Sequence, residues 1–72
     1  MSDRLDTNAM KIIEIMGVSP NSFEDALAQA VSKAAESING ISSVEVIRQT
    51  ASVRDAQIVR YEVTVKLSFV VK

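Results

Sequence analysis

The sequence predicts an α+β fold with the element order β-α-β-β, in which a three-stranded, antiparallel-type sheet of strand order 1-3-2 packs on one helix. Two patterns carry this prediction. Residues 59–71 alternate between apolar and polar side chains, as a strand with two different faces does. Residues 23–38 place apolar side chains at the i, i+3 and i+4 spacing of an amphipathic helix. Two further strand-like runs, 10–16 and 41–53, complete the sheet.

The composition of this short chain favours an oligomer. Its 72 residues include no cysteine and no histidine, so disulfides are excluded and zinc and haem lose their usual ligands. Small domains bury a limited fraction of their surface and draw stability from a disulfide, a metal or oligomerisation. Oligomerisation is the support that remains, and a hydrophobic content of 47% is consistent with it. We expect one compact domain over residues 10–72.

The charge distribution argues against nucleic acid as a partner. The formal net charge is −1, and the eight basic residues are scattered rather than clustered as phosphate binding requires. No apolar run approaches the roughly 20 residues of a membrane span, and the pattern of a signal peptide is missing. Both observations point to a cytoplasmic protein. Residues 1–9 are polar and aperiodic, which predicts a disordered arm or a tag remnant.

The first strand is predicted at residues 10–16, a β-branched and apolar run, with Gly17 closing it as a turn or bulge residue. The helix begins directly after Ser22, because Ser22 and Asp25 have the spacing of a capping box in which Asp replaces Glu. Small alanines in its apolar stripe allow the helix to lie close on the sheet. Asn39-Gly40 is predicted to end the helix as a left-handed cap.

The second strand, residues 41–53, is less regular, and its mixed segment 48–50 predicts a bulge or a partly exposed edge. The loop at 54–57 lacks the Asn-Gly or Asp-Gly of a tight hairpin. The third strand, residues 59–71, would run about 40 Å at roughly 3.3 Å per residue. Usual strands have about five or six residues. Its ends should therefore project past the cover of one small domain, which predicts partner subunits.

The connections between the elements set the order of the strands. A helical crossover makes strands one and two parallel, and the short loop makes strand three antiparallel to strand two, so strand three belongs in the middle. One of its faces packs under the helix: Tyr61, Val63, Val65, Leu67 and Phe69. The other face is polar and is expected beside residues of strand two: Arg60, Glu62, Thr64 and Lys66, with Ser43, Glu45 and Ile47. A solvated surface and a partner or ligand surface are equally compatible with that polar face.

Two runs of the sequence resemble a known family. They are KIIEIMGVSPNSFEDALAQAV at residues 11–31 and YEVTVKLSF at residues 61–69, and with the single helix before a long hairpin they look like a dodecin. The resemblance covers nearly all of the chain after Met10. It implies a hollow homo-oligomer, a dodecamer, with the helices outside and the polar sheet faces around the interior. It also implies a protein without catalytic activity that binds or stores flavins, which many dodecins hold in stacked pairs at subunit interfaces.

The flavin-binding positions of that family are changed in this chain. A Trp at the start of strand two, which stacks on the isoalloxazine, corresponds to Ser43, and a Gln after the Tyr of strand three corresponds to Glu62. The Gln pairs with the pyrimidine edge of the flavin, whereas an ionised carboxylate only accepts hydrogen bonds. The resemblance therefore implies a site for FMN, FAD or riboflavin at Ser43, Glu45 and Glu62 that has lost its two main contacts.

A cation is the second candidate ligand. Glu45 and Glu62, repeated by symmetry around an oligomer axis, would gather oxygen ligands suited to calcium or magnesium, and some Trp-lacking dodecin relatives bind calcium. Salt bridges of Glu45 or Glu62 with Arg48, Arg60 or Lys66 are the simpler interpretation and are preferred on the sequence alone. An oligomeric shell with a purely structural role, which binds no ligand, is a further alternative.

Two other classes of protein have less support. A small dimeric enzyme of ferredoxin-like type would need catalytic side chains, but the chain has no His, Cys or Trp. Its serines also lack a basic partner at the spacing of a catalytic triad. The acidic balance disfavours an interaction module for nucleic acid.

Overall fold

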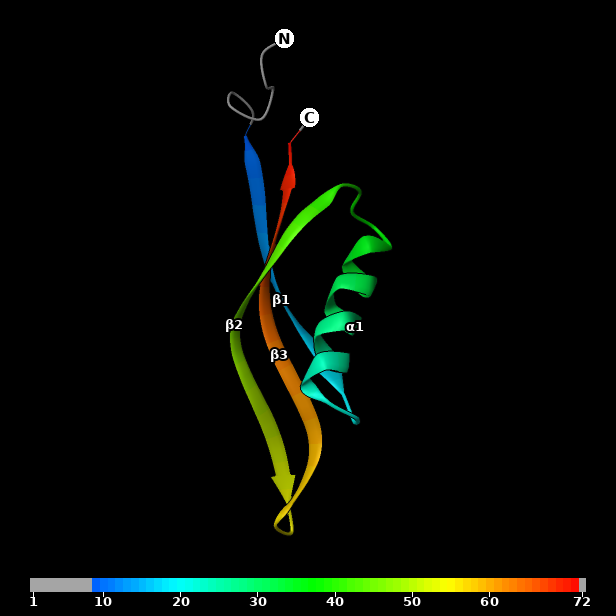
Figure 1. Cartoon of the computed structure of the whole chain (residues 1–72), viewed down its shortest axis with the longest axis vertical. Helices are drawn as coiled ribbons and strands as arrows, with labels where there is room; N and C mark the ends of the chain where they lie inside the picture. Colours follow the sequence, from blue (N-terminus) through cyan, green and yellow to red (C-terminus); the bar gives the residue numbers. More distant parts are fainter. Residues whose placement is uncertain (1–8, 72) are drawn as a thin grey trace.

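The computed structural model describes residues 9–71. Four elements follow one another along the chain: β1 (Met10–Ser19), α1 (Phe23–Ala35), β2 (Ile41–Arg54) and β3 (Gln57–Val70). Figure 1 shows the strands as one long twisted sheet with α1 lying against one of its faces. The predicted β-α-β-β order is confirmed. The arm or tag remnant predicted at residues 1–9 lies outside the described residues except for Ala9, whose carbonyl accepts a 2.9 Å hydrogen bond from the Val71 N–H.

The sheet has the predicted order β1-β3-β2, with both outer strands antiparallel to β3. β1 and β2 are therefore parallel to each other, as the helical crossover predicts. β2 has three register shifts, and the middle one, between Val46 and Arg48, leaves Ile47 outside the ladder. The bulge predicted in strand two is thus confirmed. Arg48 takes the place on the polar face that was expected for Ile47, because the bulged residue shifts the alternation by one.

The helix α1 begins as the sequence predicts. Ser22 is its N-cap, and the Ser22 hydroxyl accepts a 2.9 Å hydrogen bond from the Asp25 N–H. The Asp25 carboxylate accepts a 2.6 Å bond from the hydroxyl of buried Ser19, which ties the end of β1 to the first turn. The helix ends earlier than predicted, at Ala35, because the N–H groups of Glu36 and Ser37 bond to carbonyls three residues back. Gly40, with φ +77°, lies in the connection to β2 instead of ending the helix. No helix in residues 9–71 is long and apolar enough to cross a membrane.

Gly17 lies inside β1 and does not end it, which corrects the expectation of a turn or bulge residue. It is buried and pairs in register with Val63. A β-carbon built on Gly17 would lie 1.9 Å from the Ala26 carbonyl oxygen and 2.9 Å from the Ala30 β-carbon. The missing side chain therefore allows α1 to approach β1 closely.

The core lies between α1 and the adjoining face of β1 and β3. Its buried apolar residues are three alanines of the helix and three residues of the central strand: Ala26, Ala30, Ala34, Val63, Val65 and Leu67. Tyr61 extends this core at one end, where its ring meets that of Phe23 edge to face at a centroid distance of 4.9 Å. The helix-facing row predicted for strand three is confirmed from Tyr61 to Leu67.

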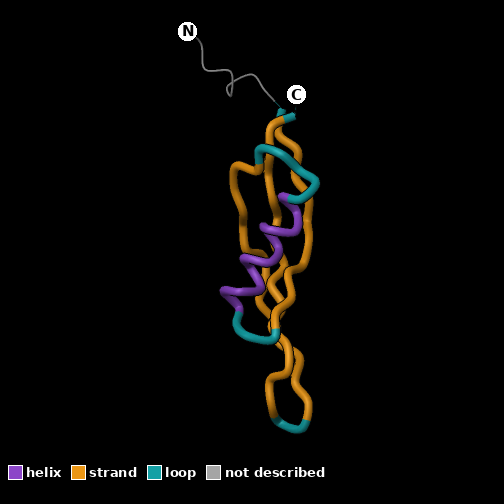
Figure 2. The backbone as a smooth tube through the Cα atoms, turned by 90° about the vertical axis from the view of Figure 1, so that its right-hand side faces the viewer, coloured by secondary structure: helices purple, strands orange, loops and turns teal. Residues whose placement is uncertain are grey.

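Beyond the first turn of α1, β2 and β3 continue as a two-stranded hairpin that projects past the helix in both views (Figures 1 and 2). Its turn consists of Asp55 and Ala56, with φ of 53° and 63°. Two positive φ values in succession are those of a tight type I′ hairpin turn, which forms here although the loop at 54–57 lacks the Asn-Gly or Asp-Gly typical of such a turn. The molecule is elongated, because its radius of gyration of 15.2 Å exceeds the roughly 11 Å of a compact domain of this length.

Candidate functional site

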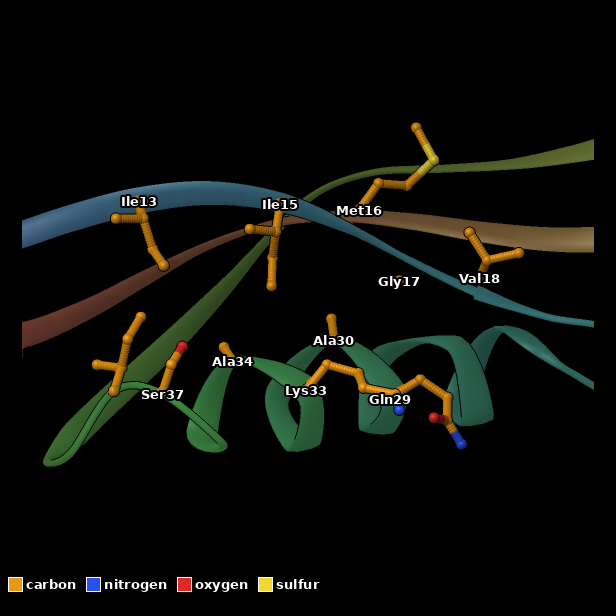
Figure 3. A pocket seen from close by; sticks show the side chains of 11 residues that line it. Ile13, Ile15, Met16, Gly17, Val18, Gln29, Ala30, Lys33, Ala34 and Ser37 are labelled. Atoms are coloured by element: carbon orange, nitrogen blue, oxygen red, sulfur yellow. The ribbon is translucent and has the colours of Figure 1, made fainter.

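The face of the sheet that α1 leaves uncovered, called the open face below, carries the residues predicted to bind a ligand. Residues opposite each other in an antiparallel register share a face of the sheet. Four rows, each written in the order β1, β3, β2, make up the open face: Val18-Glu62-Thr50, Met16-Thr64-Arg48, Glu14-Lys66-Glu45 and Ile12-Ser68-Ser43. Figure 3 shows Met16 pointing away from α1, in agreement with this assignment. The open face is thus largely apolar along β1 and polar along β3 and β2.

Glu62 is held by donors from its own chain. Its Oε1 accepts a 2.9 Å hydrogen bond from Thr50 Oγ1, and its Oε2 accepts a 3.0 Å bond from Ser52 Oγ. The Arg60 guanidinium donates to the same Oε2 from Nε at 2.9 Å, and its second nitrogen, Nη2, lies 2.6 Å from that oxygen. The Glu62 side chain is only 13% exposed. Of the salt bridges considered from the sequence, the one between Glu62 and Arg60 is present.

These contacts lower the pKa of the Glu62 carboxyl from its ordinary value. The hydrogen bond from Thr50 is the largest cause, followed by those from Arg60 and Ser52. Each donor favours the ionised form, while desolvation acts in the opposite direction and is outweighed. Glu62 is therefore an anion whose oxygens already have partners.

Ser43 lies at the other end of the open face, where it offers only a small polar group. Its hydroxyl and that of Ser68 share a hydrogen bond. None of the three aromatic residues of the chain lies where the Trp of flavin-binding dodecins would stand, the position of Ser43. Tyr61 and Phe23 pack on each other in the core, and Phe69 belongs to the helix-facing row of β3. The open face therefore has no aromatic surface on which a flavin ring could stack.

Glu45 is exposed and lies in a row of three charges. The register places Lys66 beside it, with Glu14 on the far side of Lys66. In the described part of the chain, no ion pair joins Lys66 to either carboxylate. Glu45 is thus an open-face carboxylate whose oxygens face solvent, in contrast to Glu62.

The structure brings Ser43 and Glu45 together and keeps Glu62 apart from both. Ser43 and Glu45 lie in neighbouring rows. Glu62 is four β3 residues from the Glu45 row, or about 13 Å at roughly 3.3 Å per residue, and about 20 Å from the Ser43 row. Over residues 9–71, no three acidic, His or Cys side chains come close enough to hold a metal ion. A ligand that contacts all three predicted residues would need side chains from more than one copy of the chain.

Sequence reasoning missed two sets of residues on the open face. It assigned no role to Thr50 and Ser52, because the bulge at Ile47 breaks the alternation that would place them there. It also missed the exposed apolar side chains of β1, such as Met16 and Ile12 at 54% and 61% exposure. An apolar strand without clear alternation does not tell which of its faces is covered.

Comparisons with known proteins agree with this architecture. The family model described as Dodecin matches residues 9–72. The calcium dodecin of Mycobacterium tuberculosis (strain ATCC 25618 / H37Rv) is 39% identical over 59 residues, which are 82% of this chain and 83% of the relative. A dodecin structure from Streptomyces coelicolor gives a TM-score of 0.89 at 24% identity and covers 92% of this chain and 94% of its own, which shows the shared fold.

A second solved structure combines likeness in fold with likeness in sequence. It is the crystal structure of a calcium-chelating immunodominant antigen, the calcium dodecin of Mycobacterium tuberculosis, described as having a novel calcium-binding site. Its TM-score is 0.79 at 36% identity, over 89% of this chain and 91% of that chain. One helix on a sheet with a central third strand and two unlike faces defines a small protein of the dodecin class. The chain belongs to the dodecin family, which confirms the resemblance found in residues 11–31 and 61–69.

Proposed function

We propose that this dodecin is a non-enzymatic homo-oligomer that binds a divalent cation, calcium before magnesium, on the open faces that line its interior. The observation that carries this choice is the chemistry of the open face. It presents carboxylate and hydroxyl oxygens, and it has no aromatic ring. Similarity to a calcium dodecin supports the same ligand. A cytoplasmic location stays a prediction.

The surface of the single subunit supports assembly. The chain is elongated, with a radius of gyration of 15.2 Å, so its single subunit exposes more surface than a compact domain of the same length would. Eleven large apolar residues on β1, β2, β3 and the end of the chain's described part are 40–64% exposed, among them Ile12, Met16 and Val53, which leaves an apolar surface for neighbouring subunits to cover. A hollow dodecamer is the assembly that we propose.

Calcium suits the donors that the open face offers. It takes about six to eight oxygen ligands in a flexible shell, whereas magnesium demands a small and nearly ideal octahedron. Glu45 supplies an exposed carboxylate and Ser43 a hydroxyl. Glu62 is a second carboxylate, available when Arg60, Thr50 and Ser52 release its oxygens. Because one chain does not complete such a shell, the proposed ligands come from Glu45 and Glu62 of several copies.

Flavin is the alternative ligand that the family suggests, and the open face fits it poorly. The hydroxyl of Ser43 replaces a stacking ring. The carboxylate of Glu62 would meet the carbonyl oxygens of the flavin as an anion, and its own acceptors are engaged by Thr50, Ser52 and Arg60. Flavin storage is therefore the second candidate.

Calorimetric titration of metal-stripped protein with calcium chloride tests the proposal. We expect saturable binding by the natural chain and a loss of affinity on the order of tenfold in Glu45→Gln. Glu36→Gln, which removes an exposed carboxylate of the helix end, is the matched control and should bind as the natural chain does. The variant Glu62→Gln tests the second proposed ligand.

Three other results would each overturn part of the proposal. Saturable quenching of flavin fluorescence without calcium binding would favour a flavin store. No binding of either ligand would leave a purely structural shell. A monomer or dimer at micromolar concentration in native mass spectrometry would rule out the hollow assembly.

A further inference from the structure

We propose that Lys66 is a tethered counterion of the cation site on the open face. When no metal is bound, its ammonium group balances the negative charge of Glu45 and Glu14, and calcium must displace it to bind. Lys66 thereby sets the affinity for calcium without being a ligand. This role rests on the proposed function, because it concerns the regulation of the same site.

Lys66 lies between two carboxylates. β3 is the central strand, and its register pairs Lys66 with Glu14 of β1 on one side and with Glu45 of β2 on the other. Side chains directly opposite each other in an antiparallel pair have β-carbons about 5 Å apart, so the ammonium group reaches toward both carboxylates. The two outer strands are about 10 Å apart, at two strand spacings. The attractions of both carboxylates for a cation therefore add in the space above Lys66.

A second basic side chain makes the centre of the open face electrically neutral. Because of the bulge at Ile47, Arg48 is the next open-face residue after Glu45 along β2. The two adjacent rows thus hold two carboxylates, Glu14 and Glu45, and two basic groups, Lys66 and Arg48, whose charges cancel. A neutral patch attracts a divalent cation only weakly. Calcium therefore binds at Glu45 when the basic group directly opposite, Lys66, moves away.

Lys66 can move more easily than Arg60, the basic residue that holds Glu62. Lys66, Glu14 and Glu45 are all exposed, and within residues 9–71 no ion pair joins Lys66 to either carboxylate. Arg60 instead contacts one oxygen of Glu62 with two nitrogens, at 2.9 and 2.6 Å. A Lys ammonium is a point charge on a flexible stem, whereas the Arg guanidinium is a rigid fork. Calcium should therefore compete with Lys66 for Glu45 before it competes with Arg60 for Glu62.

Removal of the Lys66 charge should raise the affinity for calcium. A unit charge about 5 Å from a divalent ion in water, screened by salt, opposes binding by roughly fivefold to tenfold in affinity. A Lys66 side chain that only packed on its neighbours would have no such effect. The sign of the change in affinity therefore distinguishes a counterion from a structural side chain.

Calorimetric titration of metal-stripped variants with calcium chloride tests this role. We expect Lys66→Gln to bind calcium with a Kd about fivefold to tenfold below that of the natural chain. Lys66→Thr is a second neutral variant, and threonine suits a strand because it is β-branched. Lys66→Arg keeps the positive charge and should show no gain. Native mass spectrometry identifies the variants that keep the assembly of the natural chain, and only these are compared.

Two further variants complete the test. Lys33→Gln is the matched control, because it removes an equal charge from the helix surface, where Lys33 lies 3.8 Å from Glu36. It should bind calcium as the natural chain does. The double variant Glu45→Gln, Lys66→Gln should show a smaller gain over Glu45→Gln than Lys66→Gln shows over the natural chain, because the carboxylate for which the two cations compete is gone.

The possible results separate the role of Lys66 from the proposed function. If the natural chain binds calcium and the neutral Lys66 variants bind it no more tightly, the counterion role is overturned while cation binding stands. An equal gain in Lys33→Gln would overturn it in the same way. If only the neutral Lys66 variants bind calcium saturably, the counterion role is supported and the proposed function of the natural chain is overturned. No binding by any variant would overturn both.

Discussion

The carbonyl oxygen of Ala26 lies directly over Gly17, where a β-carbon would stand only 1.9 Å from it. We expect Gly17→Ala to lower the free energy of unfolding by about 3 kcal/mol or more, at the upper end of the usual cost of overpacking. The added methyl group would force α1 away from β1 and loosen the contact of Ala30 with the sheet. Urea denaturation at fixed protein concentration, followed by circular dichroism, measures the change.

Gly40→Ala is the comparison for that measurement. Gly40 has φ +77° and open space where its β-carbon would stand. Alanine there adds only the cost of a left-handed backbone, about 1 kcal/mol. If Gly17→Ala were no more harmful than Gly40→Ala, close approach of the helix would not be the reason for Gly17.

The N-cap of α1 gives a second prediction. Ser22→Ala removes the acceptor of the Asp25 N–H, and loss of such a cap costs about 1 kcal/mol. Ser22→Asp keeps an acceptor and adds a negative charge at the positive end of the helix dipole, so it should stay within a few tenths of a kcal/mol of the natural chain. Urea midpoints of the two variants provide the check. Equal losses in both would contradict a capping role.

The fold was predictable from the sequence because its main signals are local. The alternation of residues 61–69 and the helical spacing of the alanines depend only on the periods of a strand and a helix. Gly17 was misassigned because its role depends on the Ala26 carbonyl, a tertiary contact. The surroundings of Glu62 were equally hidden, since its donor Thr50 is twelve residues away and reaches it only through the bulged register of β2.

The lowered pKa of Glu62 predicts the response of the protein to acid. A carboxyl whose pKa is lower in the folded than in the unfolded state contributes stability above its unfolded pKa, and this contribution is lost as the pH falls through the folded pKa. The natural chain should therefore lose stability toward acid through Glu62. Glu62→Gln should be less stable at neutral pH and should show a shallower acid dependence. Urea midpoints measured over a pH series test both expectations.

Glu36→Gln is the matched control for the pH series. It removes a carboxylate whose exposed pair with Lys33 spans 3.8 Å, and it should keep the acid dependence of the natural chain. Carbon-13 NMR titration of the Glu62 carboxyl gives the pKa directly. A value at or above that of an ordinary Glu would contradict the hydrogen bonds from Thr50, Ser52 and Arg60 as the cause.

If flavin is excluded because the open face lacks an aromatic ring at Ser43 and an amide at Glu62, restoring both groups should allow the open face to bind flavin. The double variant Ser43→Trp, Glu62→Gln should quench FMN fluorescence saturably, with an affinity about two- to tenfold higher than that of Glu62→Gln alone, because aromatic stacking contributes about 0.5–1.5 kcal/mol. The matched control, Ser42→Trp with Glu62→Gln, adds the same ring one position away and should not show this gain. Saturable quenching by the natural chain, or equal quenching by the double variant and its control, would show that Ser43 and Glu62 do not decide between flavin and cation.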